Sequence, residues 1–77
     1  KRQAQMLAPS VEDEIVFGLE NLGLPREEIT SRLDRVLGNF DLVPLRERNP
    51  HTLSGGEQQK LSLAAVMARA ARPRTRP

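Results

Sequence analysis

The 77-residue sequence contains no cysteine, tryptophan or tyrosine, and its only aromatic residues are Phe17 and Phe40. The absence of cysteine excludes disulfide bonds and thiolate metal sites, and the single histidine, His51, cannot form a metal site alone. No apolar run approaches the roughly 18 residues that would suggest a membrane span. No apolar run follows the first basic residues, as it would in a signal peptide. We therefore expect a chain with neither a membrane span nor a signal peptide.

The net charge of +2 is unevenly distributed along the chain. Residues 1–40 carry five basic and seven acidic side chains, a balance of −2, whereas residues 41–77 carry seven and three, a balance of +4. Much of this excess comes from arginines near the end, namely Arg69, Arg72, Arg74 and Arg76. Basic segments attract nucleic acid or anionic lipid, but no aromatic side chains accompany this one for base stacking. We expect residues 69–77 to form a disordered tail. A stand-alone helical module that binds nucleic acid through this tail remains an alternative.

The sequence predicts an all-α fold with three main helices, because β-branched residues never alternate over the length of a strand. Ser10 can cap the first helix, and Gly23 is expected to end it. Its apolar stripe consists of Val11, Ile15, Leu19 and Leu22, flanked by Val16 and Phe17. The second helix is expected from about Pro25 to Gly38–Phe40. Its stripe consists of Ile29, Leu33, Val36 and Leu37.

The third helix is expected from about Ser54 to Ala71, where Pro73 stops it. Ser54 can cap this helix, and Glu57 three residues later completes a capping box. The intervening Gly55 and Gly56 have no Cβ, so another molecule can approach the backbone closely. Free N–H groups and the helix dipole favour an anion there, usually phosphate. An ordinary capped helix explains the same pattern without a ligand. The residues expected to be buried are Leu61, Leu63, Ala64, Ala65, Met67 and Ala68.

The stretch 53–59, Leu-Ser-Gly-Gly-Glu-Gln-Gln, closely resembles the signature motif of ATP-binding cassette (ABC) ATPases. The preceding 48–52, Arg-Asn-Pro-His-Thr, places a basic residue and a proline where this family typically has them. Residues 5–18 resemble the segment that follows the glutamine loop. Residues 17–24, Phe-Gly-Leu-Glu-Asn-Leu-Gly-Leu, resemble the energy-coupling-factor and cobalt-type branch, which drives uptake of vitamins and metal ions. The resemblance covers residues 5–68.

This resemblance implies that residues 1–77 are part of an ABC ATPase domain, corresponding to its helical subdomain. In the family, the signature of one ATPase subunit faces ATP held by the phosphate loop of a second subunit, in a homodimer or heterodimer. Ser54 and the N–H groups of Gly55 and Gly56 would then contact the γ-phosphate, and Glu57 would cap the helix close to the ribose. His51 is expected to be an exposed loop residue beside the signature rather than the family's switch histidine.

The resemblance also implies a docking surface for a transmembrane transporter subunit, which would place the chain at the cytoplasmic face of the membrane. The docking residues would be Gln5, Glu12, Asp13 and Glu14, of which Gln5 does not align with the glutamine-loop residue. Acidic residues in a first helical turn also interact favourably with the helix dipole, and this reading is compatible with docking.

Two motifs of a complete ABC ATPase are missing from the sequence. It has no Gly-x-x-x-x-Gly-Lys-Ser/Thr phosphate loop and no apolar strand ending in Asp-Glu. We therefore expect ATP to be bound mainly by the partner subunit and Mg²⁺ by segments that this sequence lacks, with no catalytic or metal-binding residue here. The chain should not hydrolyse ATP alone. A piece of a soluble ABC ATPase is a further alternative. The resemblance implies that another subunit selects the transported substrate.

Overall fold

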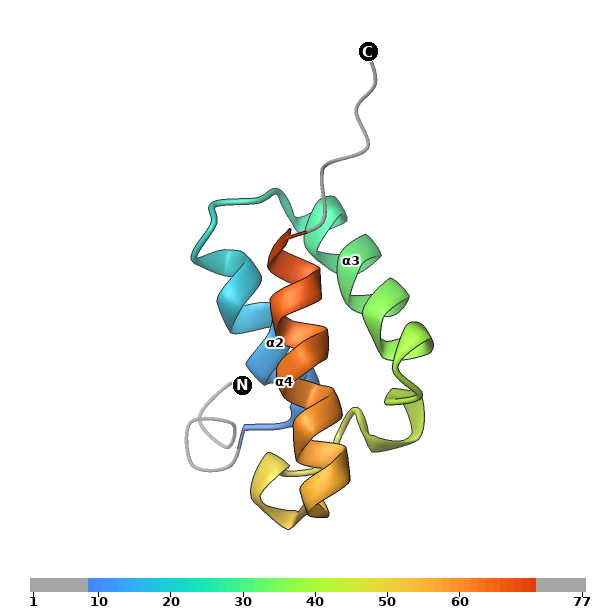
Figure 1. The fold of residues 1–77 in the computed structure, drawn as a ribbon. Helices are drawn as coiled ribbons and strands as arrows, with labels where there is room; N and C mark the ends of the chain where they lie inside the picture. Colours follow the sequence, from blue (N-terminus) through green and yellow to red (C-terminus); the bar gives the residue numbers. More distant parts are fainter. Residues whose placement is uncertain (1–8, 71–77) are drawn as a thin grey trace.

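The computed structural model describes residues 9–70 and contains no strand in that range. It confirms the predicted all-α fold with three main helices (Figure 1). The α-helices are α2 (Val11–Glu20), α3 (Arg26–Asn39) and α4 (Gly55–Ala70), and two 3₁₀ turns, η1 (Val43–Leu45) and η2 (Pro50–Thr52), lie between α3 and α4.

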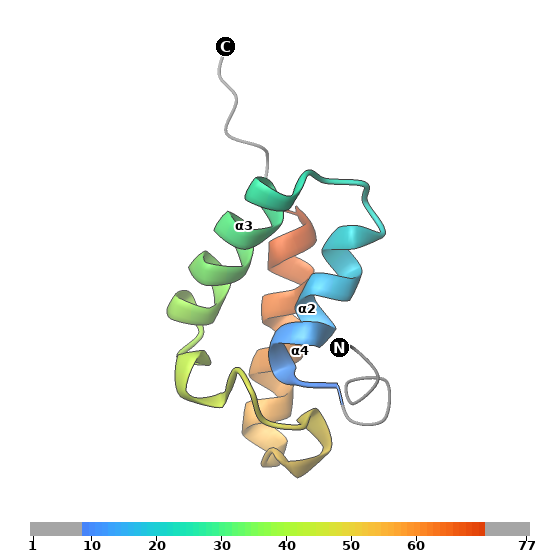
Figure 2. The same cartoon turned by 180° about the vertical axis from the view of Figure 1, so that it is seen from behind.

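Helix α4 lies between α2 and α3 in both views of the fold, and each helix contacts the other two (Figures 1 and 2). Each predicted stripe contributes to one hydrophobic core, and Leu42 and Leu53 close it from the loops. The largest fully buried side chains are Ile15, Leu19, Leu37, Leu42 and Val11. The face of α4 opposite this core has no helix of residues 9–70 packed against it (Figure 1).

The N-terminus of α2 is capped as predicted. The Ser10 hydroxyl accepts a hydrogen bond from the Asp13 N–H (3.1 Å), and the Asp13 carboxylate accepts one from the Ser10 N–H (3.1 Å). The first two helical N–H groups are also satisfied. That of Val11 donates to the Arg48 carbonyl (2.9 Å), and that of Glu12 donates to the Arg46 carbonyl (3.0 Å). The loop after α3 therefore closes this helix end, which leaves no open N–H group for an anion.

The C-terminus of α2 differs from the prediction. The helix ends at Glu20, and Gly23 has a φ of +74° but lies two residues beyond the C-cap, Asn21. Leu22 was predicted to extend the buried stripe, but it follows the helix end and is 50% exposed. Phe17 was predicted to flank the stripe and is 66% exposed. Three apolar positions, Val11, Ile15 and Leu19, therefore make the buried face of α2.

Helix α3 has its predicted apolar stripe and one buried charge that the sequence did not predict. Arg32 is 3% exposed. Its Nε donates to the Glu28 carboxylate at 3.0 Å, and one terminal guanidinium nitrogen donates to the Ala68 carbonyl of α4 at 2.8 Å. Carbonyls in the last turn of a helix have no partner within the helix, and a cation there is favoured by the dipole. Arg32 therefore links α3 to the end of α4.

Helix α4 buries a narrower face than predicted. Leu61, Ala64 and Ala68 are buried, whereas Leu63 (52%) and Met67 (51%) are exposed, contrary to the prediction. The reason is geometric: residues 61, 64 and 68 recur at helical spacing and form one face, whereas 63 and 67 lie outside that face.

The start of the predicted tail is also wrong, because Arg69 and Ala70 belong to α4. The Arg69 side chain lies over Gly18 of α2, where an added Cβ would come within 3.3 Å of the guanidinium. Gly18 therefore permits close packing of α2 against α4. The other residues of the predicted tail lie outside the described range.

Candidate functional site

The start of α4 contains the predicted capping box. The Ser54 hydroxyl accepts a hydrogen bond from the Glu57 N–H (3.1 Å), and the Glu57 carboxylate accepts one from the Ser54 N–H (3.0 Å). Within residues 9–70, no acceptor is hydrogen-bonded to the N–H groups of Gly55 and Gly56. Ser54, Gly55 and Gly56 are all exposed. This helix end is therefore open, in contrast to that of α2, and it can present two N–H groups and the positive end of the dipole to an anion.

Nothing inside the described chain requires glycine at positions 55 and 56. Neither residue has a positive φ, and a Cβ added at either one would meet no atom within 4 Å. Glycine in a helix costs about 0.5–1 kcal/mol relative to alanine. Because these two residues have no side chains, nothing shields their N–H groups, and another molecule can approach the backbone closely.

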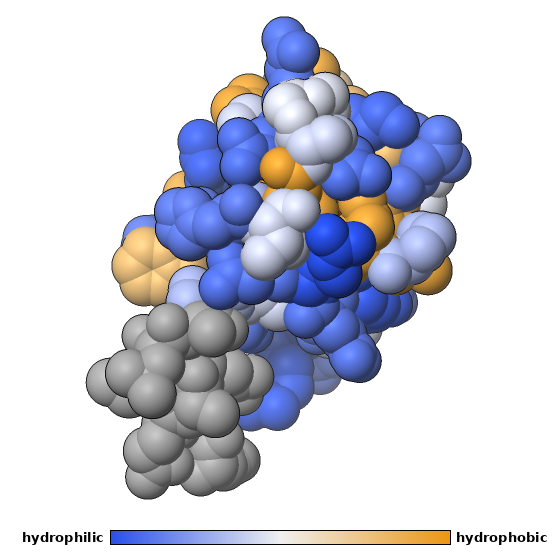
Figure 3. All heavy atoms as spheres, turned by 90° about the horizontal axis from the view of Figure 1, so that it is seen from below, coloured by the Kyte–Doolittle hydropathy of each residue, from blue (hydrophilic) through white to orange (hydrophobic). Residues whose placement is uncertain are grey.

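The turn before Ser54 is held by side-chain hydrogen bonds. The Arg48 guanidinium donates to the Thr52 carbonyl (3.0 Å) and the Thr52 hydroxyl (3.2 Å), and the Thr52 hydroxyl donates to the Asn49 carbonyl (2.7 Å). The side-chain amide of Gln58 donates to the Pro50 carbonyl at 3.2 Å. His51 lies in η2 and is exposed, as predicted. Seen from the end at which α4 begins, the surface is mostly hydrophilic (Figure 3).

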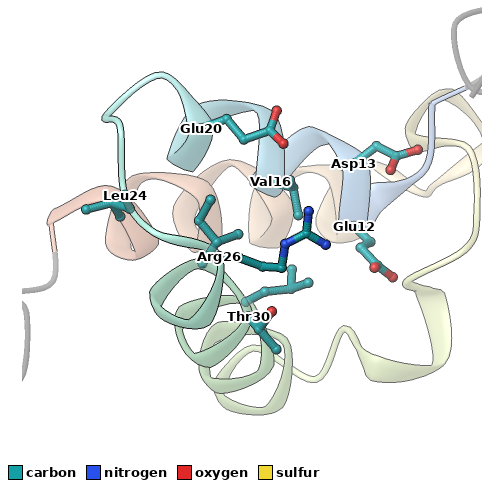
Figure 4. A pocket seen from close by; sticks show the side chains of 9 residues that line it. Glu12, Asp13, Val16, Glu20, Leu24, Arg26 and Thr30 are labelled. Carbon is teal, nitrogen blue, oxygen red and sulfur yellow. The ribbon is translucent and has the colours of Figure 1, made fainter.

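A groove of about 690 Å³ lies between α2 and α3 (Figure 4). Two of the predicted docking residues, Glu12 and Asp13, line it. Both also act within the chain, because Glu12 pairs with Arg46 (3.1 Å) and Asp13 completes the α2 capping box. Glu14 is exposed but does not line the groove. The structure thus brings Glu12 and Asp13 together and leaves Glu14 apart.

The remaining observations concern Gln5, metal ligands, membrane spans and the lining of the groove. Gln5 lies outside the described range. Within residues 9–70, no group of three His, Cys, Asp or Glu side chains is placed to hold a metal ion. No helix among the described residues combines the length and apolarity needed to cross a bilayer. Two groove residues that sequence reasoning missed are Glu20 and Arg26, which come together only through the packing of α2 on α3.

Comparison with known proteins identifies the family of this chain. The sequence matches the ABC transporter family model over residues 2–72, which is most of the chain. This chain belongs to the ABC transporter family. The resemblance carried by the Leu-Ser-Gly-Gly-Glu motif is thereby confirmed, and the three-helix structure is consistent with the helical subdomain of an ABC ATPase.

Similar proteins include ATP-binding components of importers. The nickel import ATP-binding protein NikO of Rhodobacter capsulatus is 45% identical over 65 residues, covering 84% of this chain and 26% of NikO. The energy-coupling factor transporter ATP-binding protein EcfA1 of Lactococcus lactis is 39% identical over 64 residues, covering 83% of this chain and 23% of EcfA1. YkoD of Bacillus subtilis, named for HMP/thiamine import, is 49% identical over 59 residues, covering 77% of this chain and 11% of YkoD. The chain thus spans at most 26% of these relatives.

Proposed function

We propose that this chain supplies the signature of an ATP-driven importer's ATPase subunit, completing an ATP site whose phosphate loop belongs to a second ATPase subunit. In this proposal the N–H groups of Gly55 and Gly56 and the Ser54 hydroxyl contact the γ-phosphate, while Glu57 holds the capping box. The observation that carries the proposal is the open start of α4, where these two N–H groups have no partner within residues 9–70. The names of NikO, for nickel import, and YkoD, for HMP/thiamine import, favour uptake of a metal ion or vitamin as the parent process.

The groups on the described residues fit a phosphate but supply no metal site. Exposed N–H groups at a helix start bind phosphate well, and the glycines leave space for its oxygens. Mg²⁺ would be held by segments other than residues 9–70. The catalytic chemistry would likewise come from elsewhere in the assembly, so this chain acts by binding and orienting the nucleotide.

Docking to a transmembrane subunit at the cytoplasmic face of the membrane is the second part of the proposal. It is supported by the groove between α2 and α3, whose lining includes Glu12 and Asp13. Acidic residues on this rim favour a basic partner through electrostatic complementarity.

Complementation of a defective subunit tests the signature assignment. The chain is mixed with an ABC ATPase subunit that has a phosphate loop but carries a substituted signature serine, and ATP hydrolysis is measured for the mixture and for each protein alone. We expect activity only in the mixture. Gly56→Ala should reduce it strongly, since the added methyl group obstructs the phosphate. Gly38→Ala is the matched control, because a Cβ there also meets no atom within 4 Å.

Two results would contradict the proposal. One is ATP hydrolysis by the chain alone, and the other is an equal effect of Gly56→Ala and Gly38→Ala on the mixture. Helicity measured by circular dichroism should be retained in both variants, because alanine favours helix over glycine. A loss of activity in Gly56→Ala could then not be attributed to unfolding.

A further inference from the structure

The turn formed by residues 48–52 lies directly before the open start of α4, and one arginine ties its two ends together. The Arg48 guanidinium donates to the Thr52 carbonyl at 3.0 Å and to the Thr52 hydroxyl at 3.2 and 3.3 Å. A planar guanidinium can hold two acceptors at once, which a lysine ammonium cannot do in the same geometry. The Thr52 hydroxyl in turn donates to the Asn49 carbonyl at 2.7 Å. Arg48 therefore fixes the residue that stands two places before Ser54.

These contacts matter because burial does not hold Thr52 in place. Leu53 is 7% exposed and belongs to the hydrophobic core, so packing fixes the chain at that residue. Thr52 is exposed and has no comparable packing. Its position, and with it the direction in which the chain enters Ser54, depends on the hydrogen bonds that it makes.

The backbone of Arg48 is itself anchored to another helix. Its carbonyl accepts the N–H of Val11 at 2.9 Å, which helps to close the start of α2. The guanidinium therefore extends from a fixed point to the exposed Thr52. Through this one residue, the turn before α4 is held relative to α2.

A second contact ties the same turn to α4. The side-chain amide of Gln58 donates to the Pro50 carbonyl at 3.2 Å, so this side chain reaches back from the helix to the loop. The neighbouring Gln59 is also exposed, but its side chain makes no hydrogen bond to a residue in the range 9–70. Two adjacent glutamines thus differ in what they do within the described chain.

We propose that Arg48 and Gln58 are positioning residues for the ATP site, which hold the 48–52 turn so that Ser54 and the open N–H groups of α4 keep the direction in which they meet the γ-phosphate. The inference rests on the proposed function and deepens its signature part. Groups on loops are placed less precisely than groups on helices, and Ser54 lies where a loop joins a helix. A small displacement of a positioned group lowers the rate of a reaction steeply.

Hydrogen exchange of the full chain, followed by NMR, tests the hold on the turn without any partner. The N–H groups of Thr52 and Leu53 donate to carbonyls of the same turn at 2.9 and 3.2 Å. Arg48→Gln and Gln58→Ala should each speed the exchange of these two amides about three- to tenfold, because each variant removes hydrogen bonds that keep the turn closed.

Matched controls separate these contacts from general effects of charge and composition. Arg35→Gln removes an exposed arginine of α3, and Gln59→Ala removes the glutamine next to Gln58. Each makes the same chemical change as its counterpart, but away from the turn. Exchange in the turn should stay within about twofold of wild type in both controls. Core amides of α3 should exchange at the wild-type rate in all four variants, which excludes general unfolding as the cause.

Complementation of the phosphate-loop subunit tests the consequence for the ATP site. Arg48→Gln should lower the kcat of the mixture about three- to tenfold, with the KM for ATP changed by no more than about twofold, because ATP is bound mainly by the other subunit. Arg48→Lys should retain part of the activity, since it keeps a single donor. Thr52→Val removes the hydroxyl that Arg48 holds, so Arg48→Gln should have a smaller effect in that variant than in wild type.

Several results would overturn the inference. These are equal exchange in the turn for Arg48→Gln and Arg35→Gln, a loss that appears only in the KM for ATP, or fully additive effects of Arg48→Gln and Thr52→Val. A wild-type chain that stays non-helical even in an osmolyte that favours the folded state would also count against it.

The two measurements distinguish this inference from the proposed function on which it rests. Faster exchange in the turn, without activity in any mixture, would overturn the proposed function and with it the role of Arg48 in an ATP site. Activity of the wild-type mixture that Arg48→Gln leaves unchanged would overturn this inference alone.

Discussion

Replacing Arg32 by methionine should lower the free energy of unfolding by about 2 kcal/mol, because the change removes both hydrogen bonds of a charged side chain and leaves their acceptors without partners. Arg32 is 3% exposed and bonds both the Glu28 carboxylate and the Ala68 carbonyl. Breaking a fully buried ion pair costs about 3–5 kcal/mol. Since the Glu28 side chain is 24% exposed and can turn towards water, the cost here should be smaller.

This loss would be large for so small a fold. A single core at this size leaves about 3–5 kcal/mol of net stability, so roughly two-fifths to two-thirds of it depends on the Arg32 contacts. The midpoint of thermal unfolding should fall by about 8–16 °C, given roughly 4–8 °C per kcal/mol for a domain of this length. Arg32→Lys keeps the charge but has no planar fork to reach two acceptors, so it should lie between wild type and Arg32→Met.

Thermal unfolding followed by circular dichroism measures the change, with Arg35→Met as the matched control on the same helix. Arg35 is exposed, so its substitution should stay within about 0.5 kcal/mol of wild type. Hydrogen exchange should also become faster at the end of α4, where the Ala68 carbonyl loses its partner. If Arg32→Met destabilised the chain no more than Arg35→Met does, the link between α3 and α4 would have no energetic role.

Two further substitutions test the packing around α4. Gly18→Leu should destabilise the fold because a Cβ there meets the Arg69 side chain, and adding Arg69→Ala should recover much of the loss in thermal unfolding. If the double variant were no more stable than Gly18→Leu, the contact between position 18 and the Arg69 side chain would not explain the loss of stability. Leu63→Lys and Met67→Lys should change stability by only about 0.5 kcal/mol, whereas Leu37→Ala in the core should cost about 2–5 kcal/mol. If urea unfolding showed that the two lysine variants lose as much stability as Leu37→Ala, the assignment of the exposed face of α4 would be refuted.

The sequence predicted features that depend on local chemistry. The two capping boxes are signals carried within four residues, and both Ser10 and Ser54 make the expected hydrogen bonds. Gly23 was expected to end the first helix, and it has a positive φ, which the absence of a Cβ permits, although it lies two residues beyond the C-cap. The signature stretch was found for the same reason, because its chemistry lies in consecutive residues.

Features that depend on the packing of distant segments were not predicted. Between Leu61 and Ala68 the helix is apolar on nearly all sides, so its periodicity did not distinguish the buried Ala64 from the exposed Leu63. An arginine in an amphipathic pattern is expected on the surface, so the sequence did not indicate that Arg32 is buried. The groove needed the packing of α2 on α3, and for that reason Arg26 gave no signal in the sequence.

The contrast between the two helix starts shows why a capping motif alone does not define an anion site. Both have a serine and an acidic residue three positions later, yet the α2 N–H groups of Val11 and Glu12 donate to carbonyls of a distant loop. The N–H groups of Gly55 and Gly56 have no such acceptor among residues 9–70. Hydrogen exchange should therefore be slow at the first pair and fast at the second.

An ATP-loaded ABC ATPase subunit should change this pattern at one helix only. If the nucleotide phosphate accepts hydrogen bonds from Gly55 and Gly56, their exchange should slow in the mixture, while that of Val11 and Glu12 stays as it was. Exchange monitored by NMR on the isotope-labelled chain measures this at each amide. The same subunit without nucleotide is the control, because it offers protein contacts but no phosphate. Protection of Gly55 and Gly56 that did not depend on ATP would mean that protein contacts, rather than the phosphate, cover this helix end.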